Sequence, residues 1–193
     1  MKRALLIGTI LFIAVVSTAC INNFAVQELN NKAKIYLEKG DYEAAINRLE
    51  ASVDLDNTIF ETNYNLGIAY IKAQDYKKAI NILNQAVKLK PDYTDTYYSL
   101  GIAHESYADY LEDLKPQRNN NISEDDDDIK IEPEADDKLL SPEEKKEKII
   151  SNYKAAINAY EAYLEKANNA KDSDDIKSQI ADIKEKLSEL GSN

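Results

Sequence analysis

The segment from Val26 to Tyr93 repeats with a period of 34 residues, and this repeat constrains the fold more than any other feature of the chain. Six apolar or aromatic positions recur at that distance: Tyr36, Tyr42, Ala45, Ile46, Leu49 and Leu55 return as Tyr70, Tyr76, Ala79, Ile80, Leu83 and Leu89. The register continues into a third unit, where Leu66-Gly67 becomes Leu100-Gly101. A fixed period of this length is typical of stacked repeats, in which no unit buries its apolar face alone. Such an array presents a surface and does not enclose a reaction site.

The recurring residues resemble those of the tetratricopeptide repeat (TPR), a helix-turn-helix unit. The middle unit has seven residues at the family's spacing: Leu66, Gly67, Tyr70, Ala79, Leu83, Ala86 and Pro91. The third unit has His104 at the tyrosine position, and its second helix resumes at Ala156. The resemblance implies an all-α, short TPR superhelix of about three units (26–59, 60–93 and 94–168). It also implies packing through Gly67, Tyr70, Ala79, Ala86, Gly101 and Ala156. A generic bundle of helical hairpins is the alternative.

Two glycines inside helical patterns support this register independently of the family. Glycine in a helix interior costs about 1 kcal/mol relative to alanine. Gly67 and Gly101 repeat that cost at one register, which predicts a close helix crossing that a larger side chain would block. Ala79 and Ala86 fit the same role on the facing helix. Gly40 is placed to adopt a left-handed conformation at the turn of the first unit.

An acidic insertion divides the third unit. Gly67 and Ala79 are 12 positions apart, whereas Gly101 and Ala156 are 55 apart, so 43 additional residues separate the two helices. The stretch 119–137 contains nine acids and one base, giving −8 of the chain's net −11. This composition predicts a disordered, solvated spacer over about 115–140. Its acids could instead associate with cations, but the stretch lacks the glycine of an EF-hand loop. Ser141-Pro142-Glu143-Glu144 then restarts a helix with a capping box.

The C-terminal segment 172–191 is predicted to be one more amphipathic helix. Its apolar residues alternate at spacings of four and three: Ile176, Ile180, Ile183, Leu187 and Leu190. Such a stripe favours a capping helix over the last repeat. A dimerisation stripe is the alternative.

The N-terminus has the pattern of a secretory signal peptide over residues 1–19. Lys2-Arg3 precedes an apolar run from Ala4 to Ala19, and the only cysteine of the chain, Cys20, follows. This arrangement resembles the lipid-attachment site of bacterial lipoproteins, although Ser17 departs from the usual aliphatic residue. The resemblance implies a membrane-anchored lipoprotein, acylated at Cys20 as palmitate-modified lipoproteins are, with residues 20–25 as a tether. An uncleaved anchor and plain secretion are the alternatives; all three place the repeats outside the cytoplasm, in the cell envelope.

Catalysis, cofactors and nucleic-acid binding find little support in the composition. The chain has a single histidine, His104, with no glycine-rich phosphate loop and no metal-ligand spacing. We therefore expect no enzymatic activity, no cofactor, no metal site and no small-molecule substrate. The net charge of −11 and the absence of a basic patch disfavour nucleic acid.

The TPR resemblance implies a concave groove formed by the first helix of each unit. Carried onto this chain, the partner-binding positions are Glu61, Tyr64, Ile68, Ile71 and Lys72 in unit two and Asp95, Tyr98, Ile102 and Glu105 in unit three. The expected function is an envelope-anchored scaffold that binds a protein or peptide partner and assists assembly of a cell-envelope complex. The alternative is a cation-associated or homo-oligomeric structural lipoprotein that acts through the acidic loop or the terminal helix.

Overall fold

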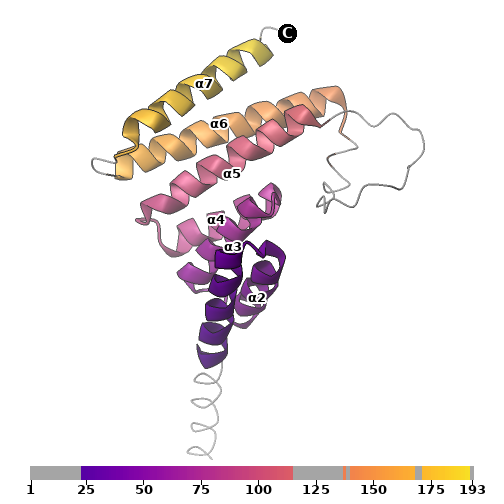
Figure 1. The fold of residues 1–193 in the computed structure, drawn as a ribbon. Coiled ribbons are helices and arrows are strands. Elements are labelled where there is room, and N and C mark those ends of the chain that lie inside the picture. The colour runs from indigo at the N-terminus through magenta and orange to yellow at the C-terminus, as the bar shows by residue number, and fades with distance from the viewer. Residues whose placement is uncertain (1–22, 115–136, 138–139, 168–170, 192–193) are drawn as a thin grey trace, which may run out of the picture.

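The computed structural model describes residues 23–114, 137, 140–167 and 171–191. All regular structure in these ranges is helical: residues 23–39, then α2 (Tyr42–Leu55), α3 (Phe60–Lys72), α4 (Tyr76–Leu89), α5 (Thr94–Asp113), α6 (Pro142–Lys166) and α7 (Ser173–Gly191) (Figure 1). The predicted all-α class is therefore confirmed. The predicted signal peptide and Cys20 lie outside the described residues, as does the acidic insertion apart from Asp137 and Leu140. Within the described ranges, no helix combines the length and apolar character needed to cross a membrane.

The turns of the first two units are built alike. Asp41 and Asp75 are the N-caps of α2 and α4, and their carboxylates accept backbone N–H bonds from Ala44 (3.1 Å) and Lys78 (3.3 Å). The chain reverses just before each cap through a residue with positive φ, Gly40 (φ 76°) in unit one and Gln74 (φ 63°) in unit two. The predicted left-handed conformation of Gly40 is confirmed.

Consecutive helices pack against each other and form a stack that begins with residues 23–39 and ends with α7 (Figure 1). Two clusters of buried side chains fill it. The first joins the opening helix, α2, α3, α4 and the start of α5, with Leu49 and Leu83 fully buried. The second joins the rest of α5 to α6 and α7, with Tyr153, Tyr160 and Ile183 fully buried.

Gly67 and Gly101 lie at very close helix contacts. A Cβ built on Gly67 would lie 2.5 Å from Leu83 of α4, and one on Gly101 would lie 2.3 Å from the ring of Tyr160 in α6. On the second helices, Ala79, Ala86 and Ala156 have no exposed surface. The first helix of each of these units therefore approaches the second at a distance that only glycine allows.

The third unit is a longer hairpin than the second. Helix α5 ends at Asp113, seven residues beyond Ser106, which corresponds to the last residue of α3. Helix α6 begins at Pro142, eleven residues before Tyr153, which corresponds to the first residue of α4. Part of the 43-residue insertion is thus folded as two helical extensions packed on each other. The predicted restart is confirmed, because Ser141 and Glu144 form a reciprocal capping box at the start of α6.

Helix α7 closes the stack with its apolar stripe turned inward. Ile176, Ile180 and Ile183 are buried in the same cluster as residues of α5 and α6, and Leu187 and Leu190 pack against that cluster. The predicted C-terminal capping helix is confirmed. The three isoleucines of the stripe are therefore covered by the chain itself, and Leu187 and Leu190 stay partly exposed.

Candidate interaction surfaces

The nine predicted groove positions lie on α3 and α5, the first helices of units two and three. Glu61, Lys72 and Asp95 are exposed, and the other six side chains are half-buried. Tyr64 and Tyr98 occupy the same register 34 residues apart, and both keep part of their rings accessible. The two helices contact each other, so these positions form adjacent parts of one surface.

Aromatic neighbours hold the ring of Tyr64. Its centroid lies 5.8 Å from that of Phe60 and 5.3 Å from that of Tyr93. The Lys90 ammonium sits over the Phe60 and Tyr93 rings at 5.0 and 5.2 Å, a cation–π arrangement. Burial raises the pKa of the Tyr64 hydroxyl, which therefore stays protonated at neutral pH. This cluster gives unit two a rigid aromatic edge.

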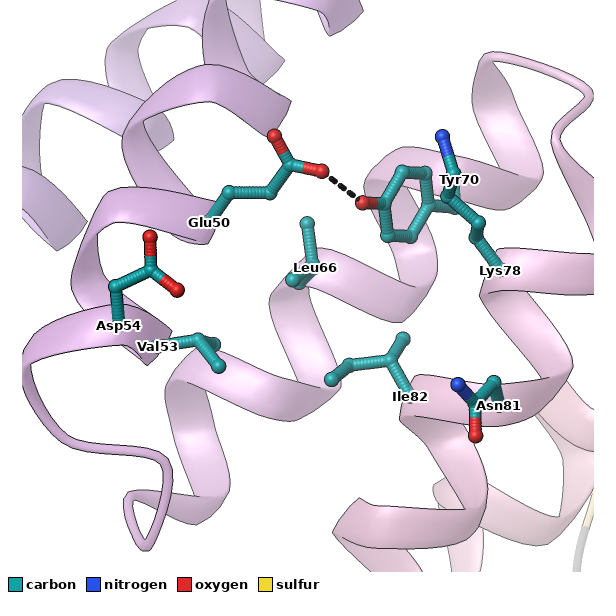
Figure 2. Close-up of a pocket in the computed structure, with 8 residues that line it drawn as sticks. All are labelled: Glu50, Val53, Asp54, Leu66, Tyr70, Lys78, Asn81 and Ile82. Atoms are coloured by element: carbon teal, nitrogen blue, oxygen red, sulfur yellow. Dashed lines mark hydrogen bonds between the residues drawn. The ribbon is translucent and has the colours of Figure 1, made fainter.

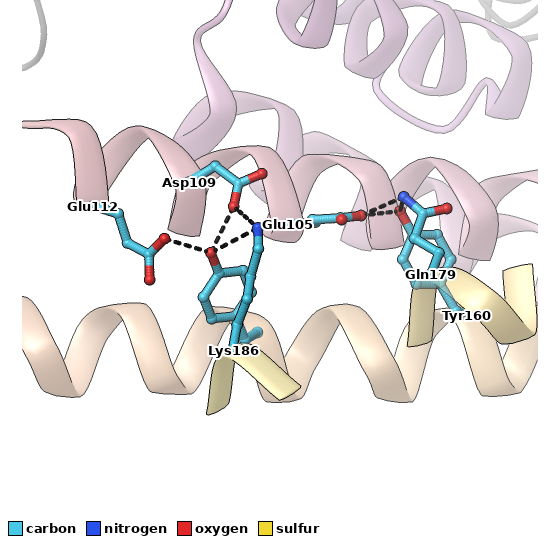
Figure 3. Close-up of polar contacts among 7 residues, drawn as sticks. Glu105, Asp109, Glu112, Tyr160, Gln179 and Lys186 are labelled. Carbon is cyan, nitrogen blue, oxygen red and sulfur yellow. Dashed lines mark hydrogen bonds and ion pairs between the residues drawn. The ribbon is translucent and has the colours of Figure 1, made fainter. Parts of the chain in front are cut away.

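The predicted groove position Glu105 is engaged within the fold. Its carboxylate accepts hydrogen bonds from the Tyr160 hydroxyl (2.7 Å) and from Nε2 of Gln179 (2.6 Å), as Figure 3 shows. Burial raises the pKa of Glu105, although both hydrogen bonds favour the charged form. The neighbouring position Tyr98 also packs on α6, with its centroid 5.9 Å from that of Tyr160. The end of the predicted groove in unit three is therefore partly taken up by α6 and α7.

A second polar group ties the same three helices further along α5. The Tyr153 hydroxyl donates to the carboxylates of Asp109 (2.5 Å) and Glu112 (2.9 Å). The Lys186 ammonium of α7 lies 2.6 Å from Asp109 and 3.3 Å from the Tyr153 hydroxyl (Figure 3). Sequence reasoning missed these contacts because the partners lie 33 to 77 positions apart with no shared motif.

A pocket of about 410 Å³ lies on another part of the surface, between α2, α3 and α4 (Figure 2). Its lining consists of Glu50, Val53, Asp54, Leu66, Tyr70, Lys78, Asn81 and Ile82. With 100° between successive helical residues, Leu66 and Tyr70 face away from the side of α3 that presents Tyr64 and Ile68. The pocket therefore opens on the opposite face of the array from the predicted groove.

Comparison with known proteins agrees with this architecture. Residues 36–102 match the family model of the tetratricopeptide repeat. The fold is a TPR superhelix. No curated protein matches the chain in sequence.

Solved TPR domains have the same fold over most of the chain. The first TPR of Spaghetti (RPAP3), bound to the HSP90 peptide SRMEEVD, is 20% identical with a TM-score of 0.55, covering 84% of this chain and 93% of that one. The Sgt2 TPR domain from Aspergillus fumigatus is 18% identical with a TM-score of 0.56, covering 87% of this chain and 82% of that one. The second TPR domain of human RPAP3, in complex with the HSP70 peptide SGPTIEEVD, is 15% identical with a TM-score of 0.56, covering 84% and 98%. At these identities the likeness concerns the fold.

Within this TPR array, Asp137 departs from the sequence-based expectation. The composition predicts that it belongs to a solvated spacer, yet its side chain is only 3% exposed. Its carboxylate accepts from the ammonium of Lys148 (2.9 Å) and the hydroxyl of Tyr107 (2.9 Å), and it pairs with Lys77 at 3.2 Å. Burial opposes the charge, but these three partners outweigh it and hold the pKa of Asp137 below its usual range. Charge density along the chain does not reveal that one of these acids is buried and paired with residues of other helices.

His104, at a TPR tyrosine position, has a packing role. Its Nδ1 lies 2.8 Å from the amide oxygen of Asn152 on α6, and burial lowers the pKa of the imidazole. The side chain is half-buried and neutral at physiological pH. Among the described residues, no group of three or more potential metal ligands comes together.

Proposed function

We propose that this protein is a TPR scaffold of the bacterial cell envelope, tethered by a lipid on Cys20, that binds a partner protein along α3 and α5 and assists assembly of an envelope complex. The observation behind the proposed groove is a repeated, accessible pattern. Tyr64 and Ile68 of α3 recur as Tyr98 and Ile102 of α5, and all four side chains are half-exposed. The repeated core positions of the same helices, Leu66 and Ala69 in α3 and Leu100 and Ala103 in α5, are buried. Aromatic anchors beside aliphatic area are typical of surfaces that recognise peptide segments.

The relatives support a peptide as the ligand class. Two of the solved TPR domains hold short peptides, SRMEEVD and SGPTIEEVD. Because the present chain has the same fold over most of its length, a segment of a partner protein is the ligand that its exposed first helices suit best.

The charge of the groove argues for a different peptide sequence from those of the relatives. Among the exposed groove positions, Glu61 and Asp95 are carboxylates and only Lys72 is cationic. An acidic segment would meet like charge, which suppresses wrong partners. We therefore expect a partner segment that is apolar with a net positive charge.

Photo-crosslinking in native cells tests the groove. A crosslinking amino acid at Tyr64 or at Tyr98 is expected to capture the same envelope protein, whereas one at Lys154, exposed on α6, is expected not to. Capture from Lys154 alone, or of unrelated proteins from Tyr64 and Tyr98, would count against the groove.

Metabolic labelling tests the tether separately. The wild-type protein is expected to incorporate a palmitate analogue and to fractionate with membranes. Cys20→Ser is expected to lose the label. A Cys20→Ser variant that keeps the label would exclude this attachment site.

A further inference from the structure

We propose that the pocket between α2, α3 and α4 binds an arginine side chain of a partner protein. This site is separate from the proposed groove, because its two α3 residues, Leu66 and Tyr70, lie on the other face of that helix. The pocket, at about 410 Å³, is large enough for one long side chain. Its exposed lining residues, Asp54, Lys78 and Asn81, all belong to the second helices α2 and α4.

The lining has two halves that correspond to the two halves of an arginine side chain. Val53, Leu66 and Ile82 provide apolar surface for the three methylene groups. Glu50 and Asp54, one helical turn apart on α2, provide carboxylates on the same side of the pocket. A guanidinium group has five N–H donors in a planar fork, which suits carboxylate oxygens better than the point charge of lysine does.

The two carboxylates differ in how far they are already engaged. Glu50 accepts a hydrogen bond from the Tyr70 hydroxyl, which fixes its side chain toward the pocket (Figure 2). Asp54 is exposed, and no hydrogen bond or ion pair of Asp54 occurs among the residues that the structure describes. A guanidinium would therefore find one oriented acceptor and one carboxylate open to it.

The cation on the opposite wall is held by other groups. The ammonium of Lys78 pairs with Asp75 at 2.9 Å and lies over the Tyr70 ring at 5.4 Å from its centroid. Asn81, beside it, adds an amide oxygen that can accept a further N–H bond. The charge that faces an incoming side chain is thus dominated by Glu50 and Asp54.

The repeat itself provides an internal comparison. At the next junction, 34 residues further on, Asn84 takes the place of Glu50 and Lys88 the place of Asp54. The apolar positions persist, since Val87 and Leu100 correspond to Val53 and Leu66. The packing that TPR units share therefore needs the apolar residues but not the carboxylates. Of the two junctions, only the first has the carboxylate pair Glu50 and Asp54.

Nuclear magnetic resonance on the full chain in detergent micelles tests the proposal. The reporters are the methyl groups of Val53, Leu66 and Ile82. The probe is the peptide acetyl-Gly-Arg-Gly-amide, compared with the same peptide containing citrulline, an uncharged analogue of arginine. The arginine peptide is expected to give saturable shifts at these methyls, with an affinity at least tenfold above that of the citrulline peptide. Equal shifts with both peptides, or no saturable shift, would overturn the proposal.

Two matched variants locate the binding. Asp54→Asn is expected to weaken the arginine peptide about tenfold, whereas Asp182→Asn, the same charge change at an exposed position of α7, is expected to leave it unchanged. An equal loss of affinity in both variants would show that the effect comes from the overall charge of the protein, and it would overturn the assignment. Tyr64→Ala, on the groove face, is expected to have no effect on this peptide, so this test is independent of the proposed groove.

Discussion

Gly101 of α5 lies directly against the ring of Tyr160 in α6, so closely that a Cβ on residue 101 would be 2.3 Å from ring carbon Cε1 and 2.8 Å from Cζ. The ring has no room to retreat, because it is fully buried and its hydroxyl is bound to Glu105. The close packing of α5 on α6 in unit three therefore requires glycine at position 101.

Gly101→Ala is expected to destabilise the protein by about 1–3 kcal/mol, the cost of overpacking a filled core. Helix propensity alone would make the alanine variant more stable by about 1 kcal/mol. A measured loss of stability would therefore have to come from the steric contact. Urea unfolding followed by circular dichroism measures the difference. Gly191→Ala serves as the control, since no atom lies within 4 Å of the position where its Cβ would be. Equal stability of the two variants would contradict the close contact.

The buried carboxylate of Asp137 is expected to contribute to stability. Asp137→Asn removes a charge that faces Lys148, Lys77 and Tyr107, and hydrogen bonds to charged groups contribute about 1.5–3 kcal/mol each at most sites. Both lysines retain access to water, so we expect a loss of about 2 kcal/mol at neutral pH. The exposed Asp113→Asn is the matched control and is expected to change stability by less than about 0.5 kcal/mol.

The effect of Asp137 has a defined pH dependence. Because its folded-state pKa lies below that of the unfolded chain, its contribution is full above about pH 4, the ordinary range of aspartate, and is lost as the pH falls further through the folded-state pKa. The stability gap between wild type and Asp137→Asn should therefore close in acid. A gap that stays constant down to pH 2 would show that charge plays no part.

Ionisation of Glu105 is expected to change the free energy of unfolding with pH in the opposite direction to that of Asp137. Its folded-state pKa is raised by burial, so the native state binds its proton more tightly than the unfolded chain does. Its ionisation then lowers stability as the pH rises from about 4, the ordinary range of glutamate, through the raised folded-state pKa. Relative to wild type, Glu105→Gln is expected to gain stability over that interval. Unfolding free energies measured from pH 3.5 to 7 test this, and a gain with falling pH would contradict it.

Apolar burial is expected to dominate the attachment of α7. Ile183 is fully buried, and Ile183→Ala is expected to cost about 2–5 kcal/mol. Lys186 is 41% exposed and pairs with Asp109, so Lys186→Met is expected to cost less than about 1 kcal/mol. Thermal unfolding of the two variants compares them. A larger loss in Lys186→Met would assign the attachment to the polar group and not to the stripe.

The candidate sites were predictable to different degrees. Tyr64 and Tyr98 could be assigned to one surface because the repeat places them on equivalent helices. The engagement of Glu105 by Gln179 could not, because these residues are 74 positions apart and belong to elements with no common motif. The pocket at Glu50 and Asp54 was also missed, since two acids on a helix usually indicate only a solvated face.

Local sequence patterns predicted where the helices lie and how several of them begin or end. The Ser141–Glu144 capping box and the stripe from Ile176 to Leu190 each act within one helix, and the 34-residue period marks each two-helix unit. These three patterns are therefore legible without coordinates. Packing between distant helices, by contrast, set the burial of Asp137, the extension of α5 and α6 into the insertion, and the acidic pocket behind α3. These features depend on which side chains meet across distant helices, and burial and pairing at such contacts follow from the packing of the whole array.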